Sequence, residues 1–185
     1  MSSQFQRKWV IYTSVGPYFA SVSTKVDVIS INIDDDELSH KKLTEGTENN
    51  AFPAPSPDGK RLLFWSGWSS YKNLYIMDTV NGEKGGLYRL TDRPWDDTMA
   101  TWSPNGDWIA FSSDRENPGS GSFALYMIHP NGTGLKKLLD NRSGGRINHP
   151  CFSLNRNSIM FTFKGGARNF YLRGFQNFFS NHELY

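Results

Sequence analysis

Short apolar segments alternate with polar turns along the chain, and residues 1–164 show no helical periodicity. Arg61–Ser66 and Trp108–Ser113 each follow a turn of the type Ser-Pro-Asx-Gly. In this turn Pro sets φ at the first corner, and Gly takes the positive φ that closes it. Asn73–Asp78 and Ala124–His129 each precede an Asn-Gly pair, the strongest two-residue signal for a hairpin. The pattern predicts short antiparallel β-strands joined by tight turns.

These segments recur with a period of 47 residues. Leu43–Gly46 returns as Leu90–Arg93, and Pro55–Gly59 returns as Trp102–Gly106. After an insertion around residues 117–122 the spacing grows to about 50. Each full repeat holds four strand-forming segments, and four-stranded units at this spacing are typical of the blades of a β-propeller.

The repeat is incomplete at both ends of the chain. Residues 9–14 match the second strand of the repeat, and residues 28–32 and 42–44 match the third and fourth, so the first strand is missing. At the other end, residues 149–153 and 158–163 match a first and a second strand, separated by a turn that has lost its Pro and Gly. The pattern therefore predicts three strands at the N-terminal end and two strands at the C-terminal end.

The expected fold class is all-β, an incomplete β-propeller of four-stranded antiparallel blades. Residues 1–164 form the repeats and residues 165–185 a tail without repeats. The blades are assigned as a partial blade at 8–44, full blades at 45–91 and 92–139, and a partial blade at 140–164.

The motifs Leu-Thr, Ser-Pro-Asp-Gly and Leu-Tyr-x-x-Asp together resemble the TolB-like (WD40-like, PD40) repeat. Two complete copies cover about residues 43–137. This repeat type is also found in the N-terminal propellers of the prolyl-oligopeptidase and dipeptidyl-peptidase families. The resemblance implies a non-catalytic scaffold that binds a protein or peptide. Two alternatives are the truncated gating propeller of a peptidase without its hydrolase domain, and a propeller acting on carbohydrate.

Three blades are too few to close a ring, because propellers generally contain four to eight. The terminal partial blades are candidates to pair into one blade. The chain is then expected to be a fragment of a larger propeller, or to complete itself by self-association through its open blade edges.

The tail is rich in aromatic residues. Tyr171, Phe175, Phe178 and Phe179 have the spacing of one helix face. Three interpretations stand beside one another: a docking helix for a partner, a helix that caps the last blade, and a foreign tail from altered splicing or a truncated gene.

Catalytic chemistry and cofactors are not expected. The sequence contains no Gly-x-Ser-x-Gly nucleophile elbow, the acidic run Asp34–Glu37 lacks the spacing of a calcium loop, and the four histidines are scattered. The prediction is no enzyme, no cofactor and no metal site. The single cysteine, Cys151, lies between Pro150 and Phe152 and is expected to be buried.

The net charge of +2, without a basic patch, argues against a nucleic-acid partner, and no stretch has the roughly 20 apolar residues of a membrane span. A polar start at residues 1–7 predicts a cytoplasmic product. For a fragment of a longer parent, a secreted or extracytoplasmic location is the alternative.

Polar and aromatic residues precede each first strand, at the edge where propellers commonly bind ligands. The candidate binding residues are Glu48, Asn49, Asn50, Trp68, Trp95, Asp96, Asp97, Arg146, Asn148 and His149. One interpretation is a ring that contacts a ligand, peptide or ion. The other is structural, with Asn50 and Asp97 satisfying backbone groups of the neighbouring blade, and with Trp68 and Trp95 packing between blades.

Overall fold

The chain forms four separate antiparallel sheets. The computed structural model describes residues 10–16, 24–34, 39–45, 48–141, 144–155 and 158–164, and the backbone of 171–173. Within these ranges there are 14 strands and no helix, and therefore no helix that could span a membrane.

The two middle sheets have four strands each, and the two terminal sheets have three. The first sheet contains β1 (Val10–Val15), β2 (Asp27–Asn32) and β3 (His40–Lys42). The second contains β4 (Asn50–Pro55), β5 (Arg61–Ser66), β6 (Asn73–Asp78) and β7 (Gly82–Arg89). The third contains β8 (Asp97–Trp102), β9 (Ile109–Ser113), β10 (Ala124–Ile128) and β11 (Lys136–Leu139). The last contains β12 (Arg146–Phe152), β13 (Ser158–Lys164) and β14 (Tyr171–Arg173).

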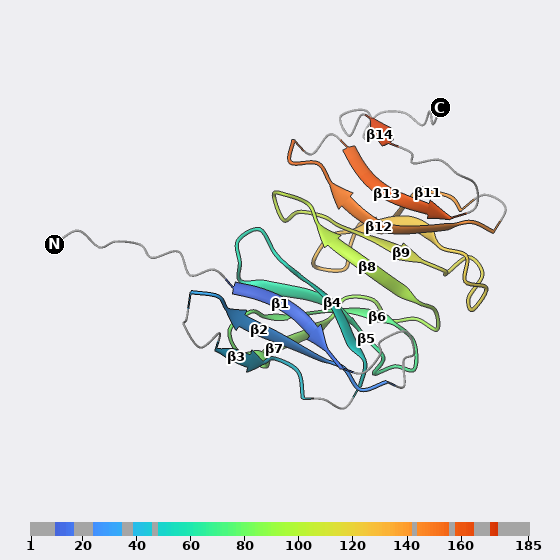
Figure 1. Cartoon of the computed structure of the whole chain (residues 1–185). Helices are drawn as coiled ribbons and strands as arrows, with labels where there is room; N and C mark the ends of the chain where they lie inside the picture. The colour runs from blue at the N-terminus through green and yellow to red at the C-terminus, as the bar shows by residue number, and fades with distance from the viewer. Residues whose placement is uncertain are drawn as a thin grey trace.

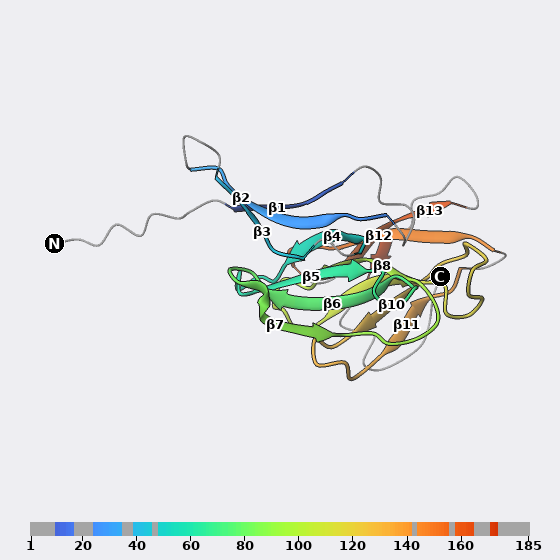
Figure 2. The same ribbon diagram turned by 90° about the horizontal axis from the view of Figure 1, so that it is seen from below.

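The sheets follow one another around an arc in chain order, as the blades of a propeller do (Figure 1). In the second sheet β4, β5, β6 and β7 lie side by side in sequence order, with β4 innermost (Figure 2). The all-β, propeller-like fold predicted from the repeats is confirmed, with two full and two partial blades. The terminal sheets do not pair with each other in the described ranges, so the arc is not closed there.

Three apolar layers hold the sheets face to face. We call the face of a sheet toward the preceding sheet its leading face, and the face toward the following sheet its trailing face. The first layer joins Tyr12, Val28 and Leu43 to Leu62, Phe64, Tyr75 and Met77. The second joins Leu63, Trp65, Leu74 and Ile76 to Ile109, Phe111, Tyr126 and Ile128. The third joins Ala110, Leu125, Met127 and Leu138 to Ile147, Phe152, Ile159 and Phe161. Because β5 is covered on both faces, Leu62–Trp65 is an unbroken apolar run instead of an alternating one.

Backbone hydrogen bonds clamp each sheet to the next at the edge where the inner strands begin. The residue before β2, before β6 and before β10 exchanges bonds with the following sheet. Val26 donates to the Glu48 carbonyl and accepts from the Asn50 amide. At the other two junctions the carbonyl of Lys72 accepts from Asp97, and that of Phe123 accepts from Ile147.

The hairpin turn after each inner strand has the same construction in three sheets. The Ser56 hydroxyl donates to Asp58 and accepts the amide N–H of Arg61. The same bonds recur at Ser103–Asn105 and Ser153–Asn155. The Ser-x-Asx pair is therefore sufficient for this bonding even in the last turn, which has neither Pro nor Gly.

Several sequence predictions need correction. The last sheet has a third strand, because Tyr171–Arg173 pairs with β13; a helix at Tyr171 is therefore wrong. Phe175, Phe178 and Phe179 lie outside the described residues. The matching of β1 to the repeat is shifted by one position, since Ser14, and not Thr13, stands opposite the third strand as Trp65 does.

Cys151 is exposed, against the prediction that it is buried. It pairs with Met160 on the trailing face of the last sheet. The corresponding residue of the second sheet, Ala54, packs against the third sheet. Cys151 is exposed because the described chain has no fifth sheet to cover this face.

Candidate functional site

The loop between the second and third sheets is ordered by a set of polar side chains. Asn73 donates from its side chain to the carbonyls of Arg93 (3.3 Å) and Trp95 (3.1 Å). Asp96 accepts the amide N–H of Lys72 at 2.9 Å, and its own amide donates to the Asp114 carboxylate at 2.8 Å. Asp96 therefore satisfies a backbone group of the preceding sheet. The structural interpretation had assigned this role to its neighbour Asp97.

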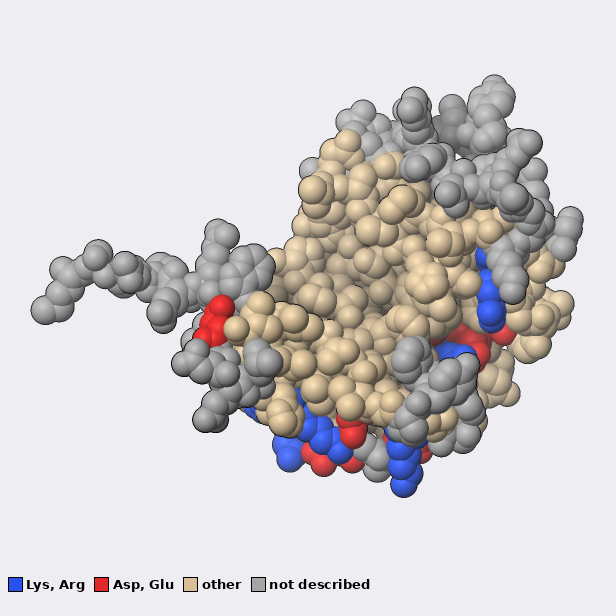
Figure 3. Space-filling view, viewed as in Figure 1, with Lys and Arg blue, Asp and Glu red and all other residues tan. Residues whose placement is uncertain are grey.

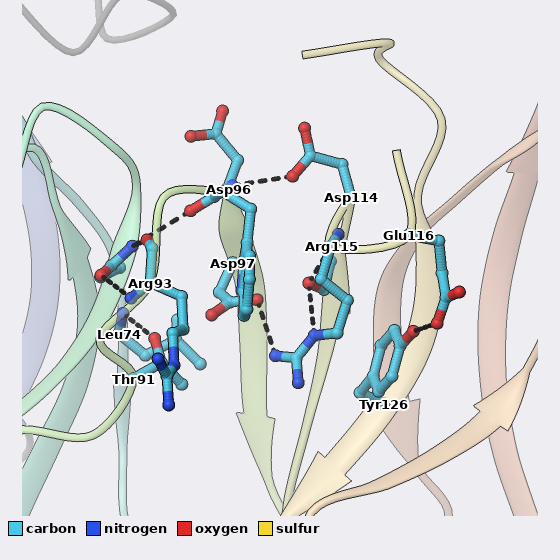
Figure 4. Close-up of polar contacts among 12 residues, drawn as sticks. Leu74, Thr91, Arg93, Asp96, Asp97, Asp114, Arg115, Glu116 and Tyr126 are labelled. Carbon is cyan, nitrogen blue, oxygen red and sulfur yellow. Dashed lines mark hydrogen bonds and ion pairs between the residues drawn. The ribbon is translucent and has the colours of Figure 1, made fainter. Parts of the chain in front are cut away.

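Asp97 carries the most deeply buried charge in this loop, and its side chain is fully enclosed. The guanidinium of Arg115, which is 11% exposed, bonds the Asp97 carboxylate at 3.1 Å (Figure 4). Burial raises the pKa of Asp97, and the Arg115 charge together with the Ser113 and Thr91 hydroxyls opposes this rise. Asp97 thus belongs to a buried ion pair that fixes β8 to the segment after β9.

Aromatic rings enclose the other side of Arg115. Its guanidinium carbon lies 5.3 Å from the centre of the Trp95 ring and 4.4 Å from that of Tyr126. The Tyr126 hydroxyl donates to Glu116 at 2.7 Å (Figure 4), and burial raises the pKa of this phenol. The closed surroundings of Arg115 indicate a structural role, because cation–π contacts and the ion pair occupy its faces and edges.

Trp68 packs between the first and second sheets. Its indole meets Tyr75 edge to face at 4.9 Å and Phe64 at 6.2 Å. It lies against the apolar layer that joins these sheets. Of the two interpretations of Trp68, its contacts match packing between blades.

The residues at the first junction are mostly buried. Asn49 and Asn50 are fully buried. The bonds that tie this segment to Val26 and to Gly67 use backbone groups of Glu48, Asn49 and Asn50. The Asn50 side-chain oxygen is buried and has no hydrogen-bond partner among the described residues.

The third junction holds the most accessible candidates. Arg146 is exposed, with its guanidinium carbon 4.6 Å from the centre of the Phe123 ring. His149 is exposed, and its Nδ1 lies 3.4 Å from the Thr162 hydroxyl. The side-chain oxygen of Asn148 is buried without a partner within the described ranges.

One residue in each of the inner strands β4, β8 and β12 has a left-handed backbone. Phe52, Met99 and His149 have φ values of 56°, 52° and 51°. Each lies in a β-bulge, where the register of β4, β8 or β12 shifts. Non-glycine residues rarely adopt such φ values, and strain of this kind persists where surrounding structure enforces it. Three sheets therefore share one strained position.

These bulges converge although the strands are far apart in the chain. The rings of Phe52 and His149 meet edge to face, with centroids 6.4 Å apart. They come from the second and fourth sheets, and Met99 occupies the same position in the sheet between them. We call Phe52, Met99 and His149 the axial cluster. Around the inner strands the hollow of this face carries no charged side chains among the described residues in view (Figure 3).

A separate groove of about 650 Å³ lies among the hairpin turns at the opposite edge. Arg61, Asp107, Trp108 and His129 line it, and the Trp108 and His129 rings lie in contact with centroids 3.5 Å apart and planes tilted by 30°. It shares no residue with the sequence-predicted site. Within the described ranges, no group of three or more His, Cys, Asp or Glu residues could hold a metal.

Sequence reasoning identified His149 but missed Phe52, Met99 and Arg115. Phe52 and Met99 occupy the repeat position of His149, so alignment of the repeats could have added them to the site. Their left-handed φ could not be predicted from the sequence, because such positions are usually recognised by a Gly or an Asn and these residues are Phe and Met. Arg115 lies in a loop outside the repeated motifs.

No family model matches the chain. The uncharacterized peptidase YuxL of Bacillus subtilis strain 168 is 31% identical over 116 residues, which is 60% of this chain and 16% of that protein. The uncharacterized protein Atu1656 of Agrobacterium fabrum strain C58 is 27% identical over 95 residues, 51% of this chain and 30% of that protein. The chain spans less than a third of either relative.

Several solved structures share the fold. A putative TolB from Agrobacterium tumefaciens has a TM-score of 0.66 at 19% identity over 84% of this chain and 50% of that one. TolB from Acinetobacter baumannii scores 0.62 at 20% identity, with 86% and 37% covered. A puromycin hydrolase S511A mutant in complex with PGG scores 0.59 at 15% identity, with 88% and 27% covered. These similarities support a propeller fold and cover at most half of the larger proteins.

Proposed function

We propose that the chain is a non-catalytic propeller scaffold of the TolB-like repeat family, and that its axial cluster binds an extended segment of a protein or peptide. The contact between Phe52 and His149 across the third sheet carries this proposal. It brings side chains from separate blades to one place, as a binding surface on a rigid scaffold requires.

The chemistry of the axial cluster favours an apolar or aromatic peptide side chain. The cluster offers two rings and a thioether, and such side chains give large contact area and adapt to irregular shapes. The hollow over the inner strands shows no charged side chain among the described residues in view (Figure 3). The Asn148 side-chain oxygen, without a partner in the described ranges, is an acceptor suited to a peptide N–H.

Repeated strain at one position supports the same role. Left-handed residues other than Gly, Asn and Asp cost roughly 1–2 kcal/mol each. Three such residues occupy the same repeat position. Backbone strain retained in this way supports a functional role for the direction of these side chains. The ten sequence-predicted candidates then include scaffold residues, such as Asp97 and Trp68, and two contact residues, Asn148 and His149.

A peptide selection tests this function. The whole chain is screened against a displayed library of random linear peptides, and enriched peptides are titrated by calorimetry. We expect Phe52→Ala and His149→Ala to weaken binding by about tenfold or more, as buried aromatic anchors do. Leu135→Ala, at a 48% exposed residue outside the axial cluster, should leave peptide binding unchanged. Enriched peptides that bind all three variants equally would refute the axial site.

The second candidate is the gating propeller of a peptidase, favoured by the match to YuxL, which is described as a peptidase. The parent gene should then encode a Gly-x-Ser-x-Gly elbow beyond this region. The full-length product should hydrolyse aminoacyl p-nitroanilides, and mutation of that serine should abolish the activity. A parent gene without such a motif excludes this candidate.

A further inference from the structure

Each internal junction packs the trailing face of one sheet on the leading face of the next. The second sheet uses both of its faces in this way: Leu62 and Phe64 face backward, whereas Leu63 and Trp65 face forward. All four are at most 2% exposed. The chain therefore contains three examples of one kind of interface, with a fixed polarity.

The leading face of the first sheet lacks such a cover in the described structure. Ile11 and Val15 of β1 are 49% and 53% exposed, and Ile29 and Ile31 of β2 are half-buried beside them. By register, Ile11 corresponds to Leu62, which is fully buried by the first sheet. None of these four β1 and β2 residues carries charge. The charge on this face comes from Lys42 of β3, which lies opposite Ile29 and forms an ion pair with Asp27.

The trailing face of the last sheet is the complementary surface. Met160 is 54% exposed, and Cys151 and Thr162 beside it are also exposed. By register Met160 corresponds to Leu63, and Cys151 to Ala54, both of which pack on the third sheet. This face has the polarity of the faces that cover a leading face elsewhere in the chain.

We propose that two copies of this chain associate head to tail, with the Cys151–Met160 face of one copy on the Ile11–Val15 face of the other. Continuity with the three internal junctions identifies the occupant, because each leading face there is covered by a trailing face of the same repeat. Such a contact is heterologous, so further copies add until a ring closes or a filament grows. The inference goes beyond peptide binding and does not use the axial cluster.

Complementation of single-face variants tests the polarity. Ile11→Glu removes the leading face, and Met160→Glu removes the trailing face. In sedimentation velocity over about 1–100 µM, the range of micromolar affinities, each variant alone should be monomeric. Their mixture should form a one-to-one heterodimer and nothing larger. Leu135→Glu, an exposed apolar residue off both faces, should associate like the wild type.

Two results overturn the inference. One is a wild-type chain that remains monomeric at about 100 µM. The other is a single-face variant that still dimerises with itself, since this indicates a two-fold contact. Circular dichroism checks that each variant melts like the wild type, and Ile11→Lys and Met160→Lys replace any that does not.

Cys151 supplies a measurement that needs no substitution. Its alkylation by iodoacetamide should slow by about tenfold or more as wild-type concentration passes through the association range. A rate that is independent of concentration refutes the proposal. Each head-to-tail interface contains one Cys151, so oxidation should not link copies. A disulfide-linked dimer as the main product would indicate two trailing faces in contact and would also refute it.

Discussion

The two middle sheets and the two terminal sheets are built from the same repeat but have different surroundings. Leu63 of β5 is fully buried, whereas Met160, at the same position of β13, is 54% exposed. The strand sequences are similar in kind, and each middle sheet has a neighbour on both sides. The comparison shows that the burial of a residue depends on whether a neighbouring sheet covers its face, more than on the sequence of its own strand, as in other repeat architectures.

The largest expected effect concerns the junction between the middle sheets, where Asp97 stands at the position of Ile147 in the last sheet. Arg115→Ala leaves the Asp97 carboxylate buried without its cation. We expect a loss of about 3–5 kcal/mol in the free energy of unfolding at pH 7, measured by urea titration. Without Arg115 the folded-state pKa of Asp97 rises further, so the loss should shrink as pH falls through that raised pKa.

The double variant Asp97→Ile with Arg115→Met is the matched control for this junction. It places apolar side chains at this junction, as Ile147 does in the last sheet. The double variant should recover most of the stability, because well-packed apolar residues often replace a buried ion pair at little cost. If the double variant is as unstable as Arg115→Ala, the ion pair contributes something that packing does not supply.

A paired truncation measures the comparison directly. Leu63→Ala should destabilise the chain by about 2–5 kcal/mol, because it leaves a cavity between two sheets. Met160→Ala, at the equivalent exposed position, should cost less than about 1 kcal/mol in dilute, monomeric protein. Urea midpoints of both variants decide the matter, and equal losses would mean that Met160 is covered in solution.

A smaller effect is expected at the shared left-handed position. His149→Asn should change the free energy of unfolding by less than about 0.5 kcal/mol, because Asn tolerates positive φ. His149→Val should cost about 1–2 kcal/mol, since a β-branched residue is strained there. Thermal unfolding of the two variants side by side tests this, and an equally stable Val variant would show that the bulge relaxes.

The smallest effect should appear in the turns, where the second sheet has Asp58 and the third has Asn105. The hydrogen bond from Ser56 holds the pKa of Asp58 below its usual value of 3.8. A lowered carboxyl pKa adds stability above the unfolded-state value, and this is lost as pH falls through the folded-state pKa. The difference in urea midpoint between wild type and Asp58→Asn should thus be constant above about pH 5 and fade below pH 3.8.

Much of the fold could be predicted from the sequence because its signals are local. Turn residues such as Pro57 and Gly59 mark the hairpins, and the apolar runs between them form the strands. The third strand of the last sheet was missed because Tyr171–Arg173 is only three residues long and matches no motif of the repeat, although the turn-forming pair Gly165-Gly166 precedes it. Cys151 was misjudged because its burial depends on a further sheet and not on its apolar neighbours.

The candidate site was predicted less well. The sequence placed the candidates at the edge where the inner strands begin, but it could not separate residues that join sheets from residues that face outward. Asp96, Asp97 and His149 look alike in the sequence, as polar residues near the start of an inner strand. Their roles differ because Lys72 and Arg115 approach the first two, and such contacts between distant segments leave no local pattern.

The backbone clamps at Val26, Lys72 and Phe123 have a consequence for how the chain unfolds. Each clamp joins the middle of one sheet to the start of the next, so a sheet cannot detach at its inner strand without releasing its predecessor. Neighbouring sheets should open together, as coupled units of a one-dimensional array. Amide hydrogen exchange should then proceed inward from both ends, with the amide of Asp97 among the last to exchange.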